Sequence, residues 1–114
     1  GVAGLAGSVS AACDTAENVL DTVLARANAP RDAAASGADF LMMLGYLTGG
    51  WQLARGAAAA AKAKDAGDGD PAFMTAKQAT ANAYMAYCLP EVGKMAARIA
   101  AGPEALASMD PAWL

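Results

Sequence analysis

Carboxylates and thiols are the side chains of this sequence that could do chemistry, because the chain contains no histidine. Without histidine it lacks the commonest general base, the commonest metal ligand and any Ser-His or Cys-His nucleophile pair. Asp14, Glu17 and Asp21 recur at three- and four-residue spacing, which places them on one face of a helix. Di-iron bundles combine such carboxylates with a Glu-x-x-His motif, which this chain cannot contain. We interpret the three residues as a solvated acidic face or a docking surface for a basic partner, and we predict no metal site.

The two cysteines and the paired glycines do not form a recognisable reactive motif. Cys13 and Cys88 lie in helical patterns without CxxC spacing, which favours buried, reduced thiols and a cytoplasmic location. Gly49 and Gly50 lie within a helical pattern rather than after a strand, so they do not predict a phosphate-binding loop. The residues alone therefore predict no catalytic residue and no cofactor site in this chain.

Aromatic and amide side chains in the C-terminal half offer two further interpretations. Phe73, Tyr84 and Tyr87 could stack on a flavin or adenine ring, although at helical spacing such residues more often form ordinary core. Gln78 and Asn82 could hydrogen-bond a ligand or could simply be solvated.

Charge and hydropathy exclude two classes of partner. The net charge is −3 and the eight basic residues are scattered, whereas nucleic-acid-binding proteins usually cluster them on one face. The uncharged stretch 40–54 would span about 22 Å as a helix, which is short of the ~30 Å hydrocarbon core of a bilayer. We therefore expect no membrane span, and we interpret the Gly45-x-x-x-Gly49 spacing as a close approach between helices of a soluble bundle.

The elements that must position these residues are helices only, since alanine dominates and no period-2 run of Val, Ile or Thr occurs. We predict a single all-α domain over residues 1–114. It is a bundle of three long helices over about Leu5–Ala27, Asp39–Ala66 and Pro71–Ala101, with a short C-terminal turn after Gly102-Pro103. Pro90 predicts a kink in the third helix, which makes the domain resemble a four-helix bundle. Residues 31–38 are predicted to be a loop or a frayed first turn.

Each predicted helix has a buried face defined by helical spacing. On the first helix this face comprises Leu5, Val9, Ala12, Ala16, Val19, Leu20, Val23, Leu24 and Ala27. On the second it comprises Phe40, Leu44, Leu47, Trp51 and Ala54, widened by Met43 and Tyr46. On the third it comprises Phe73, Ala76, Thr80, Tyr84, Tyr87, Met95 and Ile99. Three glycines inside the second helix cost up to ~1 kcal/mol each relative to alanine, which indicates that another element lies close to Gly45, Gly49 and Gly50.

The order of motifs in the C-terminal two thirds resembles the C-terminal helical domain of a subset of bacterial acyl-CoA dehydrogenases. The matching positions are Gly49, Gly50, Trp51, Ala54 and Arg55, then Phe73, Ala76, Lys77, Tyr84, Leu89 and Pro90, then Ala101, Gly102 and the run Glu104–Met109. The resemblance begins near Phe40, and the preceding residues match only as an amphipathic helix.

The resemblance implies an accessory domain excised from a longer FAD-dependent enzyme. Acyl-CoA dehydrogenases keep their FAD and their catalytic glutamate in the enzyme body, so no catalytic residue is carried over to this chain. The domain would pack on that body or on a sister subunit through the Trp51 helix. Gly45, Gly49 and Gly50 would permit the close approach, and Tyr84 and Tyr87 would lie in the core or at the rim of this contact.

Two other readings follow from the residues without the resemblance. The chain could be a free-standing interaction module that forms a homo-oligomer through an exposed apolar stripe. It could also be a peripheral membrane anchor, but this role requires a basic amphipathic helix and the first helix is acidic.

Overall fold

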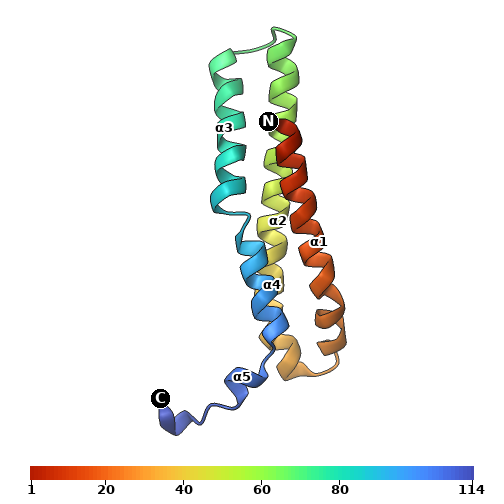
Figure 1. Ribbon diagram of the computed structural model, residues 1–114, viewed down its shortest axis with the longest axis vertical. Coiled ribbons are helices and arrows are strands. Elements are labelled where there is room, and N and C mark those ends of the chain that lie inside the picture. The colour runs from red at the N-terminus through yellow and green to blue at the C-terminus, as the bar shows by residue number, and fades with distance from the viewer.

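The computed structural model describes residues 1–114 and consists of helices and their connections, without strands. In chain order the elements are α1 (Val2–Arg26), α2 (Pro30–Asp65), α3 (Pro71–Tyr87), α4 (Glu91–Ala101), α5 (Glu104–Ala107) and the 3-10 turn η1 (Pro111–Trp113). Helices α1 and α2 run antiparallel, and α3 followed by α4 returns along α2 (Figure 1). The prediction of an all-α bundle is therefore confirmed. No helix of the molecule is both long enough and apolar enough to cross a membrane.

Helix α1 buries most of its predicted face. Leu5, Val9, Ala12, Ala16 and Val19 are buried, in agreement with the apolar spacing. Leu20 and Leu24 were predicted on the same face but are 38% and 59% exposed. At the end of the helix, Nη1 of Arg26 donates hydrogen bonds to Ser36 Oγ of α2 (2.8 Å) and to the Ile99 carbonyl oxygen of α4 (2.6 Å). Arg26 thus joins three helices at one end of the bundle.

Helix α2 begins at Pro30 and residues 31–38 form its first two turns, so the prediction of a loop or a frayed first turn over these residues is wrong. Proline is well suited to the first position of a helix, because it has no N–H to satisfy and its φ is already helical. Asp32 in the first turn complements the positive end of the helix dipole. Ser36, although polar, is buried because Arg26 supplies its hydrogen bond. In addition, Asp39 forms an ion pair with Arg98 of α4 (2.9 Å).

The buried face of α2 also differs from the prediction. Ser36, Met43, Gly50 and Ala57 are buried and recur every seven residues, while Leu44 and Trp51 are 40% and 47% exposed. Small side chains at Gly50 and Ala57 let the neighbouring helices approach, and the bulkier Trp51 is displaced to the rim. The central stretch of α2, residues 40–54, carries apolar side chains around its circumference, so apolar spacing alone does not identify the buried face.

The predicted kink at Pro90 is confirmed and is a break of three residues between α3 and α4. Proline has no N–H to donate and its ring collides with the preceding turn. At the break Leu89 N–H bonds to the Tyr84 carbonyl oxygen (3.0 Å), and the Leu89 side chain is buried in the core. On α4, Met95 and Ile99 are buried as predicted. On α3, however, the buried residue is Ala81, whereas Phe73 and Tyr87 are 55% and 84% exposed.

The C-terminal segment leaves the bundle at the end where α4 stops, and runs away from the other helices (Figure 1). Pro103 is buried, and the predicted short turn after it is α5. The large apolar side chains that follow are all exposed, namely Leu106, Met109, Trp113 and Leu114. Asp110 Oδ1 accepts a hydrogen bond from Ala112 N (2.8 Å), which caps the 3-10 turn η1.

Candidate interaction surface

Two of the predicted close-approach glycines contact other elements of this chain. A β-carbon at Gly49 would lie 2.5 Å from the Tyr84 hydroxyl oxygen, and one at Gly50 would lie 3.0 Å from Leu89 Cδ1. The Tyr84 hydroxyl donates a hydrogen bond to the Tyr46 carbonyl oxygen (2.9 Å). Burial raises the pKa of the Tyr84 phenol above its ordinary value, with smaller contributions from Cys88 and Tyr46. Gly49 and Gly50 of α2 therefore contact Tyr84 of α3 and Leu89 at the break between α3 and α4.

Gly45 behaves differently from the other two. It is exposed, and a β-carbon placed on it would have no neighbour within 4 Å. The predicted close approach at Gly45 is therefore not made within this chain.

Trp51 lines an apolar groove of about 390 Å³ between α1 and α2. We call this the Trp51 groove; it is lined by Val2, Ala6, Val9, Ser10, Trp51, Ala54, Arg55 and Ala58. Arg55 is the one charged residue in this set, and its guanidinium lies 5.0 Å from the centre of the Trp51 ring, in a cation–π contact. The groove therefore combines apolar walls with a single positive charge.

Four exposed leucines extend the same side of the molecule toward the other end of α1 and α2. Leu20 and Leu24 lie about four and five helical turns beyond Ala6 of the groove, and Leu44 lies about two turns before Trp51. Leu41 is 71% exposed and lies about four turns before Arg55. We call Leu20, Leu24, Leu41 and Leu44 the leucine patch. The sequence analysis assigned Leu20, Leu24 and Leu44 to the core and did not single out Leu41.

The carboxylates and thiols do not converge. Asp14, Glu17 and Asp21 are exposed, and nowhere in the chain does a group of three or more Cys, Asp or Glu residues lie together in a way that could hold a metal ion. Cys13 and Cys88 are half-buried and do not form a disulfide.

The predicted aromatic and amide residues also stay apart. Tyr84 points toward α2, but Phe73 is exposed beside Lys77, whose ammonium lies 5.3 Å from the ring centre, and Tyr87 is the more exposed of the two. Asn82 Nδ2 donates to the Gln78 carbonyl oxygen on its own helix (3.0 Å). The residues thus form no stacking platform and no convergent polar site.

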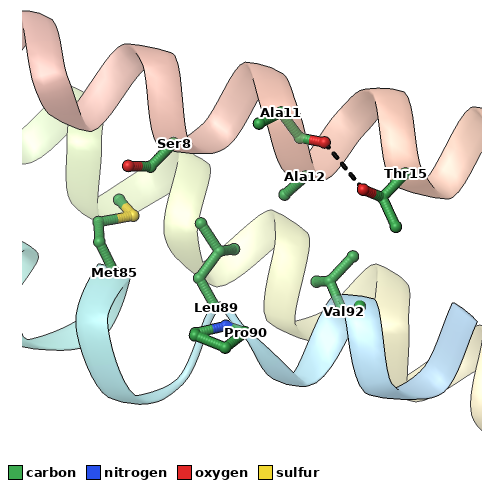
Figure 2. A pocket seen from close by; sticks show the side chains of 9 residues that line it. Ser8, Ala11, Ala12, Thr15, Met85, Leu89, Pro90 and Val92 are labelled. Carbon is green, nitrogen blue, oxygen red and sulfur yellow. Dashed lines mark hydrogen bonds between the residues drawn. The ribbon is translucent and has the colours of Figure 1, made fainter. Parts of the chain in front are cut away.

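A second hollow, of about 270 Å³, lies where α1 crosses the break between α3 and α4 (Figure 2). Figure 2 shows Leu89 pointing toward α1 from the break, below Ser8 and Ala12. The hydroxyls of Ser8 and Thr15 both donate to carbonyl oxygens of their own helix, and no ionisable side chain lines the hollow to activate them.

The family of the chain follows from a comparison with known sequences. The sequence model of the family described as acetyl-CoA dehydrogenase C-terminal like matches residues 1–110. The chain belongs to this family. The match also includes the first helix, which the sequence analysis could compare with the family only as an amphipathic helix. No curated protein and no solved structure matches the chain.

The residues of this chain do not fit a flavin. A pyrophosphate is usually held by free backbone N–H groups at a glycine-rich helix start. Here Gly49 and Gly50 lie in the middle of α2, and the space above them is filled by Tyr84 and Leu89.

Proposed function

We propose that this chain is the accessory C-terminal domain of an FAD-dependent acyl-CoA dehydrogenase and has no catalytic activity alone. The observation that carries the proposal is the family match over residues 1–110. The absence of convergent ionisable groups in either hollow agrees with it. The FAD and the acyl-CoA site then belong to the body of the enzyme, and residues 1–114 form one helical domain that packs on this body.

The leucine patch is the surface that we assign to this packing. Exposed apolar patches of this kind mark protein interaction sites in soluble proteins. Burying a leucine side chain contributes about 1.5–3 kcal/mol, so covering Leu20, Leu24, Leu41 and Leu44 would contribute several kcal/mol. The stretch 40–54 of α2 is uncharged on all sides, which is typical of a helical segment covered on all sides. The isolated chain covers it only with α1, α3 and α4.

Amide hydrogen exchange on the intact enzyme tests this assignment. We expect the segment with Leu41 and Leu44 to exchange more slowly in the intact enzyme than in the 114-residue chain, because docking suppresses local opening. Leu44→Glu should abolish this difference. Phe73→Glu is the matched control, because Phe73 is as exposed but lies on α3, and it should leave the difference unchanged. Equal exchange of the Leu41–Leu44 segment in both proteins would contradict the assignment.

A further inference from the structure

The C-terminal segment has the properties of a preformed ligand. We call residues Glu104–Leu114 the tail. Its turn η1 is fixed by Pro111 and by the Asp110 cap, and this turn displays Trp113 with 73% of its surface exposed. Tryptophan is among the residues most enriched at the centres of protein interfaces, and a preorganised segment loses less conformational entropy on binding.

The Trp51 groove has complementary properties. The tail carries Glu104 and Asp110 and no basic residue, so it is acidic. Arg55 supplies a positive charge in a groove whose walls are otherwise mainly apolar. An indole ring with an acidic residue three positions before it therefore matches this groove in both hydropathy and charge.

The tail does not lie in the groove of its own chain. It leaves the bundle at the end where α4 stops and runs away from the other helices (Figure 1). Trp113 is accordingly 73% exposed, and none of residues 104–114 lines the groove.

We infer that the Trp51 groove receives the tail of a second copy of this chain, with Trp113 inserted beside Trp51 and Asp110 next to Arg55. In an antiparallel twofold dimer the tail end of each copy lies near the groove end of the other. Both tails and both grooves are then used, and the assembly closes.

Sedimentation equilibrium of the 114-residue chain tests the inference. We expect a monomer–dimer equilibrium. Trp113→Ala and Ala58→Glu should each raise the dimer dissociation constant by at least roughly 30-fold, the effect of losing a central interface side chain. Ala58 is exposed and lines the groove, so a glutamate there repels Asp110 without entering the core. Phe73→Ala removes an exposed aromatic residue elsewhere and should leave the constant unchanged.

A mixture of the two variants separates this arrangement from direct packing of helical faces. The Trp113→Ala chain keeps its groove and the Ala58→Glu chain keeps its tail, so the mixture should form a heterodimer although each variant alone is monomeric. A monomeric wild-type chain would overturn the inference, as would a Trp113→Ala chain that dimerises as tightly as wild type or a mixture without heterodimer. Because the enzyme body is absent from these measurements, they do not depend on the proposed packing of the leucine patch.

Discussion

The hydroxyl of Tyr84 on α3 lies directly over Gly49 of α2 and bonds to the carbonyl oxygen of Tyr46, one turn earlier on the same helix. The tyrosine hydroxyl can reach that carbonyl because Gly49 has no side chain. Gly50 plays a similar part for Leu89. Of the three glycines predicted to make a close approach, Gly49 and Gly50 are explained by packing within this chain, whereas Gly45 stays open.

Alanine substitutions at the two glycines of the Gly-x-x-x-Gly pair should have opposite effects. Gly49→Ala should destabilise the chain by roughly 1–3 kcal/mol, because its methyl group overlaps the Tyr84 hydroxyl and displaces a hydrogen-bonded side chain. Gly45→Ala should stabilise it by about 0.5–1 kcal/mol, because the site is open and alanine favours the helix. Urea unfolding followed by circular dichroism measures both free energies.

The background variant Tyr84→Phe provides the control for this comparison. Without the hydroxyl, the cost of Gly49→Ala should fall by roughly 1 kcal/mol or more, so the two substitutions are coupled. Independent, additive effects would contradict the contact between Tyr84 and Gly49.

The stability of the chain should fall in alkaline solution because of Tyr84. Burial raises the pKa of this phenol above the ordinary value of about 10, so the folded state favours the protonated form. The contribution of this group is therefore complete below about pH 10 and is lost as the pH rises through the folded-state pKa. The free energy of unfolding should decrease more steeply above pH 10 in the wild type than in Tyr84→Phe. Parallel profiles for the two proteins would show that the tyrosine is not responsible.

Arg26 should be the most important polar side chain for stability. Its Nη1 bonds to Ser36 Oγ and to the Ile99 carbonyl oxygen, so Arg26→Ala would leave the buried Ser36 hydroxyl without this partner. Hydrogen bonds to charged groups contribute about 1.5–3 kcal/mol, and we expect a loss of this size in thermal or urea unfolding. Arg98→Ala is the comparison, because the Arg98 side chain is 58% exposed in its ion pair with Asp39, and this pair should contribute less than about 1 kcal/mol. Equal losses in the two variants would contradict the role of Arg26.

Met43 and Trp51 on α2 should respond differently to truncation. Met43 is fully buried, so Met43→Ala should cost about 2–5 kcal/mol. Trp51→Ala should cost less than about 1 kcal/mol in the monomer, since nearly half of the side chain is exposed. If Trp51→Ala were the more damaging change in the unfolding free energy, the sequence-based assignment of Trp51 to the core would be correct after all.

The sequence predicts the helices of this chain better than their rotation. Asp70 with Pro71 marks the start of α3, and Pro90 and Gly102 mark the ends of helical segments, because their effects on the backbone are local. The start of α2 was missed because a buried serine at position 36 depends on Arg26 from another helix. The outward position of Leu44 and Trp51 was missed for a related reason. Apolar side chains surround the central stretch 40–54 of α2, so the packing of Gly50 and Ala57 against neighbouring helices determines which face is buried.

The candidate surface was predicted only in part. Trp51 was named from the sequence as an interface candidate, which remains a prediction. The groove that it lines was not predicted, since the groove also needs Val2, Ala6 and Ser10 from α1. Such a surface arises from the antiparallel pairing of two helices and has no short motif in the sequence.

The most direct test of the central proposal is the size and visible absorbance of the native polypeptide, recovered from its source with an antibody against residues 1–114. We predict a chain several times longer than this domain, yellow from bound flavin, that oxidises an acyl-CoA while the 114-residue chain alone neither binds flavin nor oxidises it. A colourless native polypeptide of about this length would contradict the proposal and would favour a free-standing helical interaction protein.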